Sequence, residues 1–192
     1  TYSLFECIGI ELEYMIVNRK TLMPAPISDQ LIIKKIGQIT DELENGNISW
    51  SNELVLHVLE LKPTKPMPGL EGLSDDFHEN IKEINGILAE MDCQLMPTAM
   101  HPLMNPLMDV KLWPHDRNEI YSRYNEIFNC KGHGWGNLQS MHINFPFAND
   151  KEFYSLHEAI RHIMPLIPAL TASSPIFEGN GSDILDNRLA FY

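Results

Sequence analysis

One stretch near the start of the chain decides the fold: Ile8-Gly9-Ile10-Glu11-Leu12-Glu13-Tyr14-Met15-Ile16-Val17. It is apolar except for two carboxylates, and an apolar run of this length is typical of a buried β-strand. Side chains alternate across a strand, so Glu11 and Glu13 share one face while Ile10, Leu12 and Tyr14 share the other. The sequence therefore predicts a strand with one face in a core and one face that carries charge.

The two carboxylates are about 7 Å apart along such a strand, at about 3.4 Å per residue. They repel each other unless they share a proton, a basic partner or a divalent cation. No Lys or Arg precedes Arg19, so a metal ion is the simplest partner. The alternative is that Glu11 and Glu13 form the solvated face of a half-exposed edge strand, and this stretch alone leaves both interpretations open.

A second β-rich run, from Ser51 to Pro63, carries Glu53 and Glu60. These two acids are an odd number of residues apart, so on one regular strand they would face opposite sides. Either a bulge or a turn re-aims one of them, or only one belongs to the charged site. We favour Glu60, because apolar residues flank it on both sides.

A third alternating stretch surrounds His142. Polar Ser140, His142 and Asn144 alternate with apolar residues, which predicts another strand with one polar face. A lone histidine on a strand is more often structural than a ligand, but beside strand-borne glutamates it suits a mixed carboxylate and imidazole metal site. Near the end of the chain, turn-forming residues precede Arg188 and suit a loop that delivers it to an anionic ligand.

Composition limits the class of protein. The chain has 192 residues, of which 44% are hydrophobic, so it can form a single domain over residues 1–192 or part of a larger one. Its net charge of -12 argues against nucleic acid or an anionic membrane surface as the main partner. Three separated cysteines fit a reducing cytoplasm better than a disulfide framework. The longest apolar stretch, residues 160–177, is too interrupted by charges and prolines to span a bilayer.

Helical and strand patterns alternate along the chain. The patterns predict helices over residues 28–43, 70–91, 115–128 and 150–170, and further strands over residues 48–62 and 93–100. In the third helix we expect Ile120, Tyr124 and Ile127 to point inward. The sum is an α+β fold, with helices on one face of a largely antiparallel sheet and the carboxylates on the opposite, concave face.

Six motifs occur in order between Gly9 and Arg188: Gly9-Ile10-Glu11-Leu12-Glu13-Tyr14, the run from Glu53 to Pro63, Ala99-Met100-His101-Pro102, Arg123-Tyr124, Met141-His142-Ile143-Asn144 and Leu170-Thr171-Ala172-Ser173-Ser174-Pro175. In this order they resemble the glutamate-cysteine ligase family 2, the carboxylate-amine ligases. Each motif is weak alone, but six in order are fairly specific. One departs from the family, because members often carry glycine-threonine-His-Pro where this chain has Ala99-Met100-His101-Pro102, and this bears on substrate preference.

The resemblance implies the fold of the glutamine synthetase catalytic domain, an antiparallel sheet whose concave face binds metal and ATP. It also implies ATP-dependent amide formation. The γ-carboxylate of glutamate attacks ATP to give an acyl phosphate, and an amine, cysteine by default, then displaces phosphate, as in glutathione biosynthesis. Mg²⁺ or Mn²⁺ suits this chemistry, because phosphoryl transfer needs a cation that bridges phosphates and hard cations prefer carboxylate oxygens.

Roles for individual residues follow from the motifs. The implied metal ligands are Glu11, Glu13, Glu60 and His142, with Glu53 as a fifth. The implied cofactor-binding residues are Glu60, His142 and Asn144, and the implied substrate-pocket residues are His101, Arg123 and Arg188. Arg123 and Arg188 are also the implied catalytic side chains, with Arg188 contacting the glutamate carboxylate or stabilising the transferring phosphate.

The family is considerably longer than 192 residues, so we expect this chain to be the N-terminal part of a longer domain. An exposed sheet edge would then favour a homo-oligomer or low stability unless something covers it. The alternative function is a non-catalytic metal- or nucleotide-binding or regulatory domain that keeps the ligase scaffold. A third interpretation makes every acid named above a surface or ion-paired residue.

Overall fold

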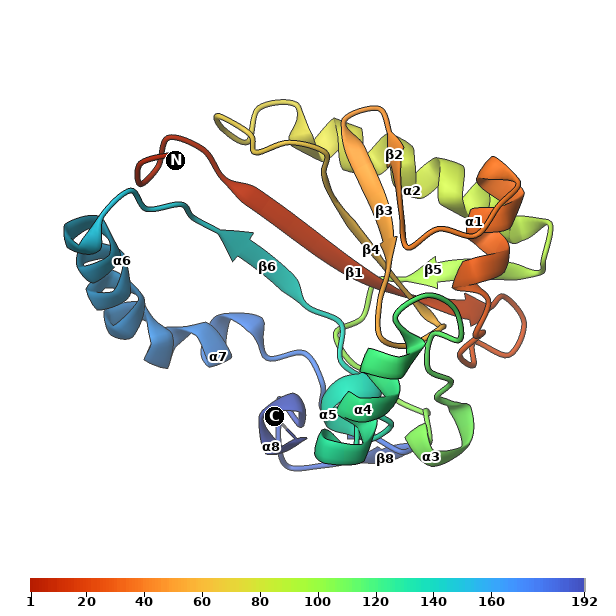
Figure 1. Ribbon diagram of the computed structural model, residues 1–192. Coiled ribbons are helices and arrows are strands. Elements are labelled where there is room, and N and C mark those ends of the chain that lie inside the picture. Colours follow the sequence, from red (N-terminus) through yellow and green to blue (C-terminus); the bar gives the residue numbers. More distant parts are fainter. Residues whose placement is uncertain (192) are drawn as a thin grey trace.

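A six-stranded antiparallel sheet forms the centre of the molecule in the computed structural model, which describes residues 1–191 (Figure 1). Its strands run in the order β2-β3-β4-β1-β5, and β6 also pairs with β1. The bounds are β1 Gly9–Asn18, β2 Glu42–Asn45, β3 Ile48–Asn52, β4 Val58–Pro63, β5 Cys93–Met96 and β6 Met141–Asn144. Together with the helices, this antiparallel sheet confirms the predicted α+β class.

The long strand β1 organises the sheet because it pairs with three strands. Its residues 12–15 pair with β4 along one edge. On the opposite edge, Met15 to Asn18 pair with β5 and Gly9 to Leu12 pair with β6. One edge of β1 therefore changes partner near its middle. Because β1 is interior, the interpretation of its acids as the face of an edge strand is wrong.

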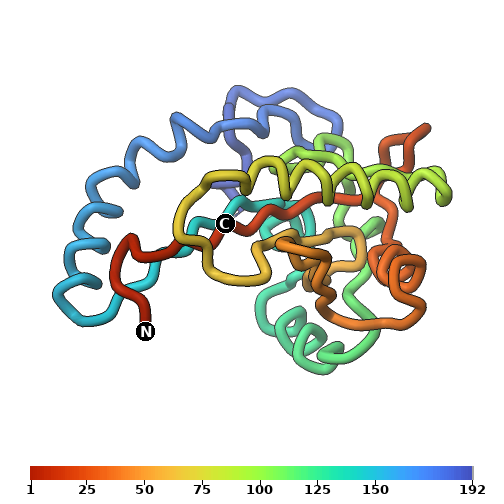
Figure 2. The backbone as a smooth tube through the Cα atoms, turned by 90° about the horizontal axis from the view of Figure 1, so that it is seen from above, coloured from red at the N-terminus to blue at the C-terminus, as the bar shows by residue number. Residues whose placement is uncertain are grey.

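Two helices cover one face of the sheet. They are α1 Ser28–Ile36 and α2 Leu73–Ala89, and Figure 2 shows α2 running alongside β1. The main core lies between this layer and the strands, and it includes fully buried Ile16, Trp50 and Leu61. The indole Nε1 of Trp50 donates a hydrogen bond to Asn80 Oδ1 at 2.7 Å, which ties the sheet to α2.

The other face of β1 differs between its two ends. Near the end of the strand, Met15 and Val17 are fully buried in a smaller core with Val58 and Met104. Glu11 and Glu13 lie on this same face, nearer the start of the strand. The alternation predicted from the sequence is therefore present, and the charged positions lie next to the smaller core.

The remaining elements are short or peripheral. They are α3 Pro106–Asp109, α4 Asn118–Phe128, α5 His133–Gly136, α6 Asp150–Ile163, η1 Met164–Leu166, α7 Ile167–Thr171, β7 Ile176–Phe177, β8 Asn180–Gly181 and α8 Arg188–Phe191. Figure 1 shows α6 and α7 arching away from the sheet, and neither helix has a buried residue. In the described part of the chain, no helix has the length and apolar character needed to cross a membrane.

Two predictions about helices are wrong. The helix predicted over residues 28–43 ends at Ile36, because Gly37 adopts a left-handed φ of 81° and its N–H caps the carbonyl of Ile33. Residues 42–45 form β2 instead, which pairs with β3 through a two-residue turn at Gly46 and Asn47.

The second error concerns α4, whose residues Ile120, Tyr124 and Ile127 were expected to point inward and are 52%, 44% and 58% exposed. The amphipathic spacing in α4 therefore marks a face that the described residues leave open.

The predicted helix over residues 150–170 is interrupted by η1, whereas the helix predicted over residues 70–91 is confirmed by α2.

Candidate metal centre

Strand register places acidic and imidazole side chains together on one face of the sheet. Glu13 of β1 lies opposite Glu60 of β4, and Glu11 of β1 lies opposite His142 of β6. The four side chains come from three neighbouring strands. Residues separated by up to 131 positions in the sequence therefore meet because of how β1 pairs on its two edges.

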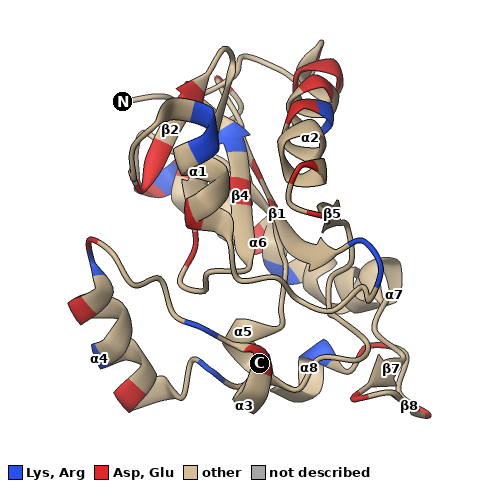
Figure 3. Ribbon diagram, turned by 90° about the vertical axis from the view of Figure 1, so that its right-hand side faces the viewer, with Lys and Arg blue, Asp and Glu red and all other residues tan. Residues whose placement is uncertain are grey.

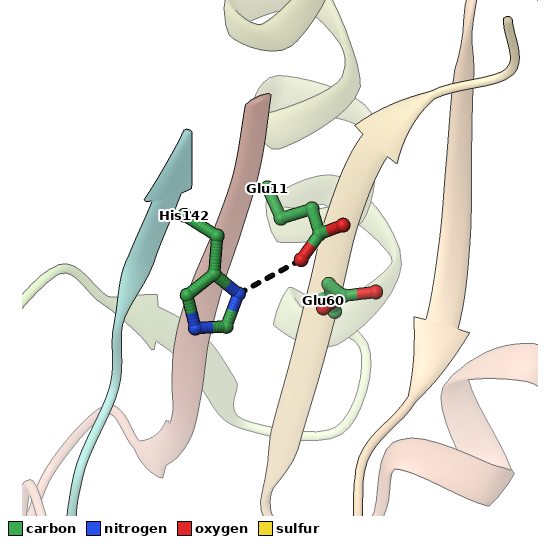
Figure 4. Close-up of side chains that lie close together, drawn as sticks. All are labelled: Glu11, Glu60 and His142. Atoms are coloured by element: carbon green, nitrogen blue, oxygen red, sulfur yellow. Dashed lines mark hydrogen bonds and ion pairs between the residues drawn. The ribbon is translucent and has the colours of Figure 1, made fainter. Parts of the chain in front are cut away.

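The first ligand group consists of Glu11, Glu60 and His142, each offering one ligand atom within 4.8 Å of the others. Figure 4 shows Glu11 and His142 pointing toward one another from adjacent strands, with Glu60 beside them. His142 Nδ1 lies 2.8 Å from Glu11 Oε2. The amide of Asn144 donates to Glu11 Oε1 at 2.8 Å, so Asn144 orients the carboxylate.

The second group consists of Glu13, Glu53 and Glu60, with the same spacing limit of 4.8 Å. The chain turns between β3 and β4, and this turn brings Glu53 back beside Glu60. Of the two possibilities left open by their odd spacing, the structure has the turn. Glu60 is common to both groups, so the two groups form one continuous cluster.

Hydrogen bonds hold several of these carboxylates in place. Glu60 is 7% exposed, and its Oε1 accepts from Ser51 Oγ and from Lys62 Nζ, both at 3.0 Å. Glu13 Oε2 accepts from the backbone N–H of Ser140 at 2.7 Å. Figure 3 shows acidic residues on helices α2 and α4 and also within β4. The β4 acid is the costly one, because a charge inside a sheet needs a partner.

The ionisation of the cluster reflects burial and mutual repulsion. Burial raises the pKa of Glu53 to about 7, and the charges of Glu60 and Glu13 act in the same direction. Burial also raises the pKa of Glu13, against the effect of its hydrogen bond from Ser140. Burial alone would lower the pKa of His142, but the hydrogen bond to Glu11 and the nearby carboxylates outweigh it, so that pKa is raised. A divalent cation would relieve this repulsion.

The donor set fits a hard divalent cation. Four carboxylates and one imidazole suit Mg²⁺ or Mn²⁺, whereas a soft metal would favour thiolates. The cysteines Cys7, Cys93 and Cys130 are free, and none belongs to either ligand group. The first group supplies two carboxylates and the imidazole, and the second supplies three carboxylates.

A cavity of about 910 Å³ opens beside the second group. Glu13 and Glu53 line it, and so does Arg188. It lies where β1 changes partner, since residues 97–99 after β5 and residues 138–140 before β6 contribute to its wall. The aromatic residues Tyr121 and Trp135 form part of the remaining wall of this cavity. A ligand here would meet carboxylates, a guanidinium and apolar walls.

A smaller cavity of about 380 Å³ lies beside the first group. Glu11 and Asn144 line it together with Lys62 and Lys65. Gly9 also contributes, and a Cβ added there would lie 3.3 Å from Asn144 Cβ. The small cavity thus meets the cluster at Glu11, and the large cavity meets it at Glu13, Glu53 and His142.

The three residues assigned to the substrate pocket are placed very differently. Arg188 lines the large cavity. Arg123 has a 71% exposed side chain, pairs with Glu126 at 2.6 Å and is not among the cavity-lining residues in the described chain. His101 is 1% exposed, with Nε2 2.7 Å from the carbonyl of Leu22 and Nδ1 accepting from Leu103 N at 3.1 Å. The structure therefore brings Arg188 to the cavity and does not bring Arg123 or the ring of His101.

Several residues that hydrogen-bond to Glu60 or to Arg188 were assigned no role from the sequence. Lys62 could have been found, because it lies two residues after Glu60 and so on the same strand face. Ser51 lies opposite Glu60 only once β3 and β4 are paired. Asp186, which binds Arg188, had no signal in the sequence beyond its nearness to the arginine.

Comparison with known proteins gives two matches. The model of the glutamate-cysteine ligase family 2 matches residues 7–192. An uncharacterized protein of Archaeoglobus fulgidus is 40% identical over 186 residues, which cover 96% of this chain and 49% of that protein. The chain thus spans about half the length of the curated relative it matches.

Proposed function

The chain belongs to the glutamate-cysteine ligase family 2, and from that premise we propose that it carries the metal site of an ATP-dependent carboxylate-amine ligase. The proposed product is a γ-glutamyl amide formed by way of an acyl phosphate, with cysteine as the default amine. The glutamine synthetase-like fold and the concave binding face implied by the family are part of this proposal. The observation that carries it is the cluster of Glu11, Glu13, Glu53, Glu60 and His142.

The cluster would hold Mg²⁺ or Mn²⁺ through its two ligand groups. When bound, the cation supplies neutralisation of phosphate charge, which phosphoryl transfer requires. Asn144 keeps Glu11 oriented and the backbone of Ser140 keeps Glu13 oriented. Such fixed ligands lower the reorganisation needed at the site.

We assign the two cavities to different substrates. The smaller cavity, with Lys62 and Lys65 beside Glu11, offers the positive charge that nucleotide phosphates need. The larger cavity offers Arg188 for the carboxylate of glutamate and apolar walls for the acceptor amine. The metal cluster lies between the cavities, because Glu11 lines one and Glu13 and Glu53 line the other.

The test is product detection by mass spectrometry. The purified protein is incubated with ATP, Mg²⁺, glutamate and a pool of amino acids and small amines. A γ-glutamyl product together with ADP would support the ligase and identify the acceptor. Loss of both products in Glu13→Gln, with an unchanged circular dichroism spectrum, would assign the chemistry to the cluster.

Two results would contradict the proposal. Wild-type turnover in Glu13→Gln would remove Glu13 from the metal site. Binding of ATP and Mg²⁺ by a folded protein that releases no ADP with any amine would indicate the non-catalytic binding domain instead. Glu44→Gln is a suitable control, because Glu44 is an exposed glutamate on β2.

A further inference from the structure

A buried network of polar side chains surrounds Arg188. Asp186 is 7% exposed, and its Oδ1 accepts from Arg188 Nε at 2.7 Å. Its Oδ2 accepts from Arg188 Nη2 at 3.1 Å. Such a two-point contact between a carboxylate and a guanidinium fixes the plane of the guanidinium as well as its distance.

The network also fixes Asp186 itself. Ser174 is 3% exposed, and its hydroxyl donates to Asp186 Oδ1 at 2.6 Å. The backbone of Ser174 is held between Leu185 and Asn187, since its N–H donates to the Leu185 carbonyl and its carbonyl accepts from the Asn187 N–H, both at 3.1 Å. The carboxylate of Asp186 is therefore held in place by Ser174 as well as by Arg188.

The remaining donors of Arg188 show which part of it can meet a ligand. Nη2 also donates to the carbonyl of Thr171 at 2.8 Å, so Nε and Nη2 are occupied. Within residues 1–191, Nη1 has no hydrogen-bond partner. Because Arg188 lines the large cavity, Nη1 is the nitrogen left for a ligand there.

A free guanidinium in this cavity would have competing partners. Glu13 and Glu53 line the same cavity, and carboxylates attract an unpaired arginine. Asp186 supplies a closer carboxylate that is already aligned, and the ion pair with Arg188 holds the pKa of Asp186 below its usual range. The arginine is thereby kept on its own wall of the cavity.

We propose that Asp186 is the positioning residue for Arg188: supported by Ser174, it directs Nη1 into the large cavity to bind the carboxylate of the amino-acid substrate. This inference rests on the proposed function for the identity of the substrate. It assigns to Asp186 no contact with substrate, and it assigns to Ser174 only the support of Asp186.

The kinetic test compares Asp186→Asn with wild type, using glutamate as the probe. We expect the KM for glutamate to rise about 10- to 100-fold, as for the loss of a charged hydrogen bond, with kcat and the KM for ATP within about twofold. Arg188→Gln added to Asp186→Asn should then have little further effect, since both substitutions disable the same contact. Asp183→Asn, an exposed aspartate of the same loop, is the matched control.

A second variant separates positioning from folding. Ser174→Ala leaves the carboxylate of Asp186 in place but removes its support, so we expect a smaller rise of about threefold to tenfold in the KM for glutamate. If Asp186→Asn instead raised every KM and lowered kcat together, with additive effects of Arg188→Gln, the role of Asp186 would be structural and the proposal would fail.

An NMR measurement makes the inference independent of turnover. The Nε–H resonance of Arg188, assigned by its loss in Arg188→Lys, should be protected from solvent exchange in wild type and lose that protection in Asp186→Asn. Unchanged protection would overturn the positioning role even in an active ligase. A protein with no ligase activity but with the expected change in protection would overturn the proposed function and leave the positioning of Arg188 standing.

Discussion

The packed side of the sheet and the side around β6 differ in how firmly they hold their residues. Met15, Ile16 and Val17 of β1 are fully buried, with a core on each face. On β6, Met141 is 62% and Ile143 is 50% exposed, and in the described chain β6 pairs with β1 alone. The metal cluster crosses this boundary, so Glu13 and Glu60 belong to a packed framework while His142 belongs to a strand held along one edge.

The largest effect should come from breaking the packed side. Trp50→Ala should lower the free energy of unfolding by about 3–5 kcal/mol, because it leaves a cavity in the core and removes one of the two hydrogen bonds that Asn80 Oδ1 accepts. Ile143→Ala on β6 should cost less than about 1 kcal/mol, because half of that side chain is exposed. Denaturant unfolding measures both, and equal losses would show that the two sides are equally packed.

Metal binding should depend most on the ligand that both groups share. Glu60→Gln should weaken Mn²⁺ binding by about 100-fold or more, whereas Glu11→Gln should weaken it by about tenfold because the second group keeps its three carboxylates. Isothermal titration calorimetry with Mn²⁺ measures both. Glu42→Gln is the control, since Glu42 also contacts Lys62 but lies outside the cluster. Equal losses of Mn²⁺ affinity in Glu60→Gln and Glu11→Gln would contradict the sharing of Glu60 between the two ligand groups.

Glu53 should make the metal-free protein less stable as pH rises. The pKa of Glu53 is raised from 4.5 in its ordinary state to about 7. Its contribution to stability is therefore full below pH 4.5 and is lost as pH rises through about 7. The raised pKa of His142 acts in the same direction.

Glu53→Gln should remove the part of this pH dependence that Glu53 supplies. We expect it to stabilise the metal-free protein at pH 8 by about 1–2 kcal/mol and to change little at pH 4, where the wild-type carboxyl is already neutral. Thermal unfolding with and without excess Mg²⁺ provides the measurement, and Mg²⁺ should restore stability to wild type at pH 8. An identical pH profile in Glu53→Gln would exclude Glu53 as the source.

The smallest effect should come from a residue that only orients a ligand. Asn144→Ala removes the hydrogen bond to Glu11 and should weaken Mn²⁺ binding by about threefold to tenfold. The unfolding midpoint should stay within about 1 °C, since β6 contributes little buried surface. A loss as large as that of Glu11→Gln would make Asn144 a ligand in its own right.

Residue spacing within single strands predicted which candidate side chains share a face of the sheet. Alternation around Glu11 and Glu13, and around His142 and Asn144, predicted which side chains share a face, because strand geometry is local. It could not decide on Glu53, whose position depends on a turn between two strands.

Features that depend on contacts between distant segments could not be predicted from the sequence. His101 and Arg123 belong to short motifs, but only the fold shows that the ring of His101 binds backbone atoms and that Arg123 lies on an exposed helix. The Gly46-Asn47 pair did offer a hairpin signal that the helical interpretation of residues 28–43 overlooked. Gly37 offered a helix stop in the same stretch.

The divided edge of β1 gives the two ligand groups different opening behaviour. Because β5 and β6 occupy separate lengths of that edge, β6 can detach by local unfolding without disturbing β5 or β4. Such an opening would carry His142 and Asn144 away while Glu13, Glu53 and Glu60 stayed together. Amide hydrogen exchange would then show the amides of β6 exchanging faster than those of β4. The four carboxylates would stay together, and the imidazole of His142 would rejoin them each time β6 closes.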